Sequence, residues 1–193
     1  MKAFCCISLF LLASLPSLSQ PGLEKWKWHG ALSAALVNGG SGASGQVLVS
    51  AEAVRNDGWA FGASSGFDYY GYRSVPLSLD ARRYFGGGIR QLFAQASAGA
   101  NIAWPTESQR LHYSWWGEAE EARFSSGLCS DIGLGYMITN RAGRSLFLSA
   151  DYGIKSMGKT VTETVWNGTG SEEATRSSRY TFHRVLVRIG VRF

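Results

Sequence analysis

Cysteine is scarce in this sequence, and long apolar runs are absent. Two of the three cysteines, Cys5 and Cys6, lie near the beginning of the chain, and the third is Cys129. If the first segment is removed, Cys129 remains alone, so a secreted fold must be stable without an intramolecular disulfide. The apolar stretch over residues 3–15 is too short for a membrane-spanning helix, which needs about 20 residues.

The first segment has the pattern of a secretory signal. Lys2 supplies a positive charge before the apolar stretch, and Ser17 and Ser19 place small residues at the positions that a signal peptidase recognises. We predict a signal peptide over residues 1–19, followed by one domain over residues 20–193.

Helical periodicity is absent after this segment, and alternation with period two takes its place. Apolar residues occupy every second position in eight segments, with small or polar residues between them. Such alternation is typical of β-strands that have two different faces. The eight predicted strands cover residues 26–37, 46–55, 59–69, 76–85, 91–104, 124–138, 145–157 and 185–193.

Short and longer connections alternate along the chain. The short, turn-like connections are residues 56–58, 86–90 and 140–144. The mostly longer connections are residues 38–45, 71–75, 105–122 and 158–178. Tight turns on one side and longer loops on the other are typical of a hairpin sheet that crosses a membrane.

One face of the predicted strands is apolar, and the other carries small or charged residues. A soluble barrel such as a lipocalin places apolar residues inside, and alternation alone does not exclude that arrangement. The signal segment, the terminal Phe193 and the loop asymmetry favour lipid outside. Eight strands then leave room only for packed side chains, so we expect ion pairs that fix register rather than an ion path. The charged residues are Glu52, Asp68, Asp80, Arg82, Asp131, Asp151, Lys155, Arg184, Arg188 and Arg192.

Aromatic residues lie near both ends of the predicted strands. Those near the short turns are Trp59, Phe85, Tyr136 and Phe193, and those near the longer loops are Tyr69, Trp104 and Tyr180. Aromatic residues favour strands in general, but membrane barrels also carry an aromatic girdle at each interface. We therefore predict two girdles.

The last segment, Val185 to Phe193, resembles the assembly signal of bacterial outer-membrane β-barrels, with alternating apolar residues and a terminal Phe. Residues 26–193 resemble small eight-stranded barrels of the OmpX/OmpA membrane-domain type and the outer membrane protein β-barrel domain family. The stretch Phe61 to Phe85 is similar to the third and fourth strands of that family. The sequence departs from the OmpA pattern in having no periplasmic domain after Phe193.

The resemblance implies an all-β fold, an eight-stranded antiparallel up-and-down transmembrane β-barrel in the bacterial outer membrane. It also implies recognition by the barrel assembly machinery through Phe193, and it carries no shared activity. The first and last strands must pair, because an open edge in hydrocarbon leaves backbone groups unsatisfied at several kcal/mol each.

The stretch "LHYSWWGEAEE" contains a possible catalytic pair. His112 and Ser114 are two residues apart, so both point to one side of a strand, and Glu118, Glu120 and Glu121 follow. A base beside a hydroxyl, oriented by a carboxylate, is the minimum for nucleophilic catalysis. The pair superficially resembles the His-x-Ser of outer-membrane lipid A deacylases, but the surrounding residues of that family are missing. The alternative is that these residues are exposed on an extended hairpin.

Other motifs indicate no site. The Gly86–Gly88 run precedes no helix, which both nucleotide-binding glycine motifs require. Cys129 has no partner at metal-ligand spacing, and the three histidines, His29, His112 and His183, are scattered. The arginines of the last strand are spread along it rather than gathered in a patch, which argues against nucleic acid. We expect no catalytic residue, cofactor or metal.

The loops over residues 105–122 and 158–178 are the remaining candidates for function. They are mildly acidic and contain Trp115, Trp116 and Trp166. On a rigid scaffold such loops can bind a partner, or cations at the lipopolysaccharide surface. The alternative is that they are solvated loops whose aromatic residues rest on the interface. In either case we expect the barrel to contact outer-membrane lipid and lipopolysaccharide. We predict a non-enzymatic outer-membrane protein with a structural or surface-interaction role. A deacylase-like hydrolase using His112 and Ser114, or a soluble secreted ligand-binding barrel, are the alternatives.

Overall fold

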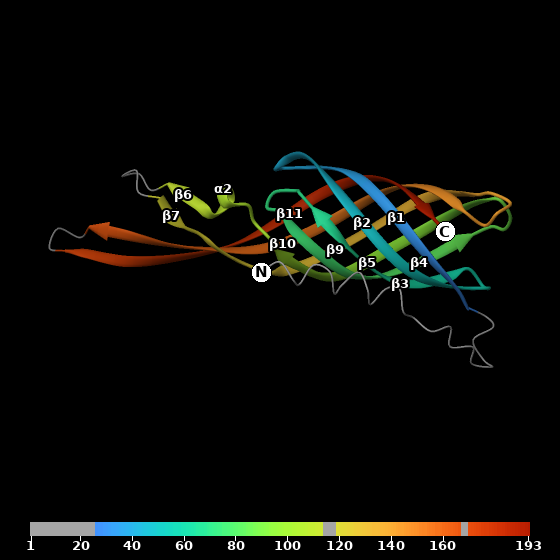
Figure 1. Ribbon diagram of the computed structural model, residues 1–193, viewed down its shortest axis with the longest axis horizontal. Coiled ribbons are helices and arrows are strands. Elements are labelled where there is room, and N and C mark those ends of the chain that lie inside the picture. The colour runs from blue at the N-terminus through green and yellow to red at the C-terminus, as the bar shows by residue number, and fades with distance from the viewer. Residues whose placement is uncertain (1–25, 114–118, 167–169) are drawn as a thin grey trace.

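The computed structural model describes residues 26–113, 119–166 and 170–193. Within them, eight long strands form an antiparallel sheet that closes on itself (Figure 1). The strands are β1 (Trp26–Gly39), β2 (Gly42–Arg55), β3 (Trp59–Asp68), β4 (Ser74–Phe85), β5 (Arg90–Ala103), β9 (Gly127–Thr139), β10 (Ser145–Trp166) and β11 (Ser171–Arg192). The predicted signal peptide, residues 1–19, lies outside the described residues.

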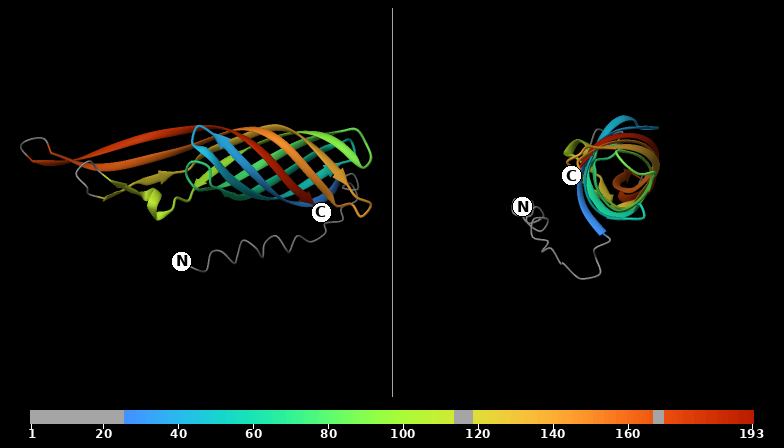
Figure 2. Two further views of the ribbon diagram at one scale, coloured as in Figure 1. Left: turned by 90° about the horizontal axis from the view of Figure 1, so that it is seen from above. Right: turned by 90° about the vertical axis from the view of Figure 1, so that its right-hand side faces the viewer.

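Strands that follow one another in sequence also pair in the sheet. The order is β1-β2-β3-β4-β5-β9-β10-β11, and β11 pairs again with β1. The view along the axis in Figure 2 shows the resulting ring of tilted strands. The predicted eight-stranded up-and-down barrel is therefore confirmed. No helix in the described ranges is both long and apolar enough to cross a membrane.

The seam between β1 and β11 ends on the last residue of the sequence. These strands pair from Gly39 opposite Arg184 to Ala31 opposite Arg192. Beyond them, Gly30 and Phe193 each donate a backbone N–H to the carbonyl of the other, at 2.9 Å. A Cβ atom placed on Gly30 would lie 2.7 Å from Cε2 of Phe193, so the aromatic ring lies directly over this glycine. Phe193 therefore covers the seam with its side chain and closes it with its backbone.

The apolar face of the barrel points outward. Leu36 and Leu79 are 76% and 74% exposed, which a soluble protein does not tolerate over a whole wall. The exposed aliphatic residues of this wall include Leu32, Val47, Val49, Leu77, Leu92, Leu128, Ile132, Leu134, Leu146, Leu148, Val187 and Ile189. The soluble ligand-binding barrel considered from the sequence is therefore wrong, because its apolar face would have to point inward.

Aromatic side chains border this apolar wall at both ends. Trp59, Phe85, Tyr136 and Phe193 are exposed at one end, and Tyr69 and Trp104 at the other, as predicted. Tyr180 is the exception. It shares the parity of the lumen residue Arg184 and packs on Tyr72 and Phe182 above the barrel mouth, because strand parity rather than height decides which face a side chain joins.

The two ends of the barrel differ in their connections. At one end, which we call the turn end, the links between β2 and β3, β4 and β5, and β9 and β10 are short, as predicted. At the opposite end, which we call the hairpin end, β10 and β11 extend far beyond the other strands (Figure 1).

Two of the predicted longer loops are strand pairs instead. Residues 38–45 form the end of a hairpin, because β1 and β2 remain paired up to Gly39 opposite Gly42. Residues 158–166 and 171–178 likewise belong to the ends of β10 and β11, which pair from Ser145 opposite Arg192 to Trp166 opposite Ser171. Glycine, serine and threonine look like loop residues in sequence, but here each backbone group finds its ladder partner across the hairpin.

The third predicted longer loop, residues 105–122, contains short regular elements. They are α2 (Glu107–Arg110), β6 (Leu111–Tyr113) and β7 (Ala119–Glu121), and β6 pairs with β7. The following short strand β8 (Arg123–Ser125) pairs with β10. This arm therefore stands beside the long hairpin at the same end of the barrel (Figure 1).

Deleting Phe193 is expected to lower the free energy of unfolding by about 1–3 kcal/mol, because the backbone groups of Gly30 lose their partners in apolar surroundings. The variant Phe193→Ala keeps both backbone bonds and should lose less. Urea unfolding in phosphatidylcholine vesicles, followed by tryptophan fluorescence, measures both. Equal losses in the two variants, or no loss, would contradict the role given to the backbone pair.

Candidate functional site

All ten charged residues that the sequence assigns to the polar face line the lumen. Eight are buried, while Asp80 and Asp131 are partly exposed around a small cavity. Five are cations and five are carboxylates, so their formal charges balance. The cations are Arg82, Lys155, Arg184, Arg188 and Arg192, and the carboxylates are Glu52, Asp68, Asp80, Asp131 and Asp151.

Glu52 on β2 collects the charges nearest the turn end. Its Oε2 accepts from Nη1 of Arg82 at 3.0 Å, and its Oε1 accepts from Nη1 of Arg192 at 3.3 Å. The hydroxyl of Tyr84 also donates to Oε1, at 3.2 Å. One carboxylate therefore joins strands β2, β4 and β11 across the lumen.

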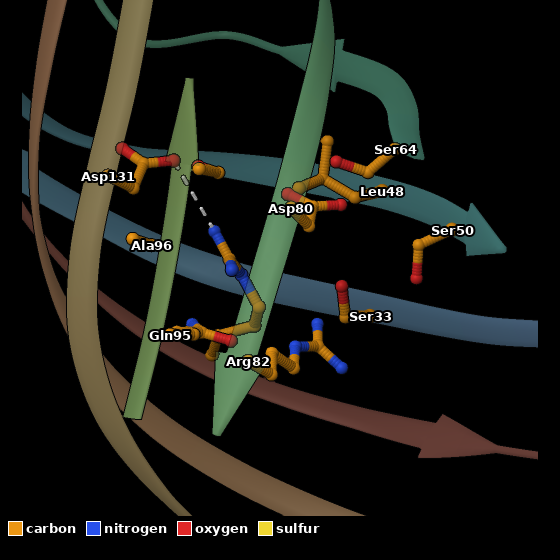
Figure 3. A pocket seen from close by; sticks show the side chains of 11 residues that line it. Ser33, Leu48, Ser50, Ser64, Asp80, Arg82, Gln95, Ala96 and Asp131 are labelled. Carbon is orange, nitrogen blue, oxygen red and sulfur yellow. Dashed lines mark ion pairs between the residues drawn. The ribbon is translucent and has the colours of Figure 1, made fainter. Parts of the chain in front are cut away.

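Arg188 on β11 occupies the middle of the lumen. Its guanidinium lies 3.5 Å from the Asp151 carboxylate and 3.8 Å from that of Asp131, and Figure 3 marks the contact with Asp131 by a dashed line. Nη2 of Arg188 also donates to the side-chain oxygen of Gln46 at 3.2 Å. Asp151 accepts further from Gln95 and from Ser149, so the carboxylate is held from three sides.

Asp68 at the end of β3 collects the charges nearest the hairpin end. It pairs with the guanidinium of Arg184, and Nζ of Lys155 lies 3.5 Å from its Oδ1. Arg184 also reaches Asp131, at 3.2 Å. Since Asp131 contacts Arg188 as well, the middle and hairpin-side groups form one continuous network.

Lys155 also ties the link between β3 and β4 to the lumen. Its Nζ donates to the carbonyl oxygens of Tyr70 and Tyr72, at 2.8 and 2.7 Å. The buried ring of Tyr70 packs with Val37 and Leu186, and Phe182 lies against this cluster. The link therefore folds inward and closes the lumen at the hairpin end. The sequence predicts only a longer connection here, over residues 71–75.

Tyr72 joins a second aromatic cluster above that closure. Its ring centroid lies 4.8 Å from Phe124, 5.8 Å from Tyr180 and 6.1 Å from Phe182. Burial, with a smaller contribution from Tyr180, raises the pKa of the Tyr72 hydroxyl. The cluster joins β8 and β11 to the folded link, which braces the base of the projecting hairpin.

Aromatic side chains fill the lumen near the turn end. Tyr84, Phe93, Met137 and Phe147 pack in one apolar cluster, and the rings of Phe93 and Phe147 meet edge to face with centroids 6.2 Å apart. A cavity between the two closed ends has a volume of about 10 Å³, room for a single water molecule. The lumen is therefore packed, as expected from the strand number.

Two glycines make room for the central carboxylates. Gly133 lies opposite Asp151, and Gly153 lies opposite Asp131. A Cβ atom on Gly133 would lie 2.0 Å from Oδ1 of Asp151 and 2.4 Å from the carbonyl oxygen of Ala150. A Cβ atom on Gly153 would lie 2.0 Å from Oδ1 of Asp131. Each carboxylate therefore occupies the space that a side chain on the neighbouring strand would need.

The possible catalytic pair is only partly within the described residues. His112 lies on β6 with its backbone opposite Glu120 on β7, while Ser114 and Glu118 lie outside the described residues. The structure thus neither assembles nor separates the two side chains.

The other candidates from the sequence remain apart. Over residues 26–113, 119–166 and 170–193, no group of three or more His, Cys, Asp or Glu side chains is placed to hold a metal ion. His183 pairs with the Tyr152 hydroxyl on the outer wall, at 2.7 Å, and His29 lines the mouth at the turn end. The buried Cys129 is a free thiol whose Sγ contacts the Ala100 carbonyl oxygen at 3.5 Å.

The variant Glu52→Gln is expected to lower the free energy of unfolding by about 3–5 kcal/mol, because two buried guanidinium groups lose their shared counter-charge. The exposed Glu107 in α2 offers the matched control Glu107→Gln, which should change little. Urea unfolding of both variants in phosphatidylcholine vesicles makes the comparison. A loss for Glu52→Gln no larger than that of the control would refute the proposed role of Glu52.

The variant Gly133→Ala is expected to cost about 1–3 kcal/mol, because the new methyl group must displace backbone as well as the Asp151 carboxylate. Gly40→Ala is the matched control, since a Cβ atom there meets nothing within 4 Å. The same unfolding assay compares the two variants. Similar stability of Gly133→Ala and Gly40→Ala would show that the lumen accommodates a methyl group at residue 133.

The barrel is similar to solved structures of other proteins. The outer membrane protein OprG from Pseudomonas aeruginosa is similar over 88% of this chain and 97% of its own, with a TM-score of 0.58 and 10% sequence identity. Neisserial surface protein A is similar over 86% of this chain and 94% of its own, with a TM-score of 0.53 and 12% identity.

No family model matches the sequence, and no curated protein sequence matches it either. The narrower resemblance to the OmpX/OmpA type therefore stays a prediction. At such low identity the structural likeness establishes the fold, and the outward apolar wall supplies the independent sign of a bilayer. The chain is a small eight-stranded β-barrel of the bacterial outer-membrane type.

Proposed function

We propose that this chain is a non-enzymatic outer-membrane protein that acts through the surface at its hairpin end. The observation that carries the proposal is the contrast between the two parts of the molecule. The lumen is packed and nine of its ten charged residues form ion pairs, whereas β10 and β11 continue as a paired ribbon well beyond the barrel wall (Figure 2).

The projecting ribbon has the features of an exposed, ordered platform. Cross-strand hydroxyl contacts link Thr160 to Ser177 at 3.3 Å and Thr162 to Thr175 at 3.4 Å. Arg176 and Arg179 are exposed along β11. Function concentrates on segments of this kind when a rigid scaffold positions them, so the barrel serves as the base and the ribbon as the contact surface.

The packed lumen also supports a role other than transport or catalysis. Glu52, Asp68 and Asp151 each accept contacts from cationic side chains. A general acid or base must reach substrate, and these carboxylates are buried behind the closures at both ends.

The partners follow from the same arrangement. We propose that residues 105–122 and 158–178 contact a surface partner or lipopolysaccharide, although much of both segments is strand rather than loop. Phe193, at the opposite end, is the residue through which the barrel assembly machinery would recognise the chain. We propose no nucleic-acid partner and no cofactor.

Shortening the hairpin is expected to abolish the surface role and preserve the barrel. Joining Thr160 to Ser177, which lie opposite each other, through an Asn-Gly turn keeps every strand pair in the wall, including those between β8 and β10. The variant should reach the outer membrane at the normal level and shift on heating as the full chain does. Cells lacking the gene and supplied with this variant should show the same envelope permeability and surface binding as cells without the gene.

Full complementation by the shortened chain would place the function in the barrel rather than the hairpin. Mass spectrometry of lipid A from the same cells tests the absence of enzymatic activity. An acylation pattern that changes with the gene, and reverts in His112→Ala and Ser114→Ala variants, would contradict it and favour the deacylase-like alternative.

A further inference from the structure

Arginine residues gather on the outside of the turn end. Arg55 ends β2, Arg83 and Arg90 flank the turn between β4 and β5, and Arg141 and Arg144 lie in the turn between β9 and β10. We call these five residues the basic collar. Within the described ranges, Asp57 is the one acidic side chain on the outer side of this end.

Strand register places Arg83 and Arg90 on the lipid-facing side of the wall. Arg83 lies opposite Trp59, and Arg90 lies opposite Ile138; residues directly opposite in a sheet share a face. The guanidinium carbon of Arg83 is 5.3 Å from the centre of the Trp59 ring. Because tryptophan marks the level of lipid headgroups, Arg83 lies at that level, and the exposed turns that carry the other arginines lie at the same end of the barrel.

Most of the collar's charge is not compensated by the protein. Asp57 pairs with Arg55, and the hydrogen bond from Arg55 lowers the pKa of the Asp57 carboxyl. This pair leaves the other four arginines without a side-chain ion pair at this end. Among the described residues, the exposed side chains of Arg90, Arg141 and Arg144 have no ion pair or hydrogen bond.

These three arginines stand on neighbouring turns. The backbone N–H of Thr139 donates to the carbonyl of Ile89 at 2.7 Å, which joins the turn before Arg90 to the strand that leads into Arg141 and Arg144. The side chain of Ile89 is 60% exposed and offers an apolar contact beside the three charges. A cationic group above an apolar contact matches a lipid with an anionic headgroup.

From this arrangement we propose that the collar binds anionic glycerophospholipids in the leaflet at the turn end. The phosphate would lie among Arg90, Arg141 and Arg144, since guanidinium groups bind phosphate oxygens in pairs. The acyl chains would then follow the outer wall past Ile89 and Leu92. The proposal rests on the proposed function, because it requires the barrel to lie in a membrane.

The test uses the full mature chain refolded into vesicles containing equal amounts of phosphatidylglycerol and phosphatidylcholine. Native mass spectrometry of the released protein counts the lipids of each kind that remain bound. We expect about fivefold more phosphatidylglycerol than phosphatidylcholine, the factor corresponding to about 1 kcal/mol from one basic residue at an anionic surface. The triple variant R90Q/R141Q/R144Q should retain both lipids equally.

The matched control is R123Q/R176Q/R179Q, which removes three exposed arginines from the hairpin side and should keep the preference. Equal retention of both lipids by the unaltered chain would overturn the proposal, and so would an equal loss of preference in the two triple variants. In a second set of vesicles that also contains lipid A, stronger retention of lipid A than of phosphatidylglycerol, abolished by R90Q/R141Q/R144Q, would overturn the assignment to glycerophospholipid.

A chain that does not fold into a barrel gives a different result from a barrel that shows no lipid preference. If the chain does not form a heat-modifiable band even in phosphatidylcholine vesicles, the proposed function fails. A chain that forms this band and shows no lipid preference rejects the basic collar alone.

Discussion

Charge neutrality inside a narrow lumen is the constraint on which the rest of this structure depends. Charged groups removed from water are costly unless they are paired, and here the carboxylates meet cations from strands that are distant in sequence. Arg192 on β11 meets Glu52 on β2, and Arg184 on β11 meets Asp68 on β3. These contacts fix which residues face inward, so they also fix the outward apolar wall and leave the two rims as the surfaces open to partners.

Much of the fold could be predicted because alternation and parity are local properties. A period of two identifies strands. Because side chains alternate between the two faces of a strand, assigning Arg188 and Arg192 to the lumen assigns every second residue of that strand to the same face. Prediction of the charged lumen succeeded for the same reason. The identity of each ion pair could not be predicted, because partners such as Arg184 and Asp68 meet only when the sheet closes.

The sequence-based prediction failed where the amino-acid composition favours a loop but the backbone is paired in a strand. Residues 38–45 and 158–178 are rich in residues that favour turns or solvent, yet residues 38–39, 42–45, 158–166 and 171–178 extend as paired strands, because a hairpin satisfies its own backbone wherever the register continues. The inward fold of the link at Tyr70 was also missed, since it depends on the distant Lys155. The arginines of the basic collar are separate in the sequence, and only the closed sheet brings their turns to one end of the barrel.

Electrophoresis of a purified outer-membrane fraction, with and without boiling in detergent, tests the central claim most directly. A closed barrel with a paired lumen resists detergent until heated, so the chain should appear in this fraction and its band should shift on boiling. The variant Glu52→Gln should shift at a lower temperature than the unaltered chain. A band confined to the soluble fraction, with the same mobility before and after boiling, would contradict both the outward apolar wall and the closed lumen.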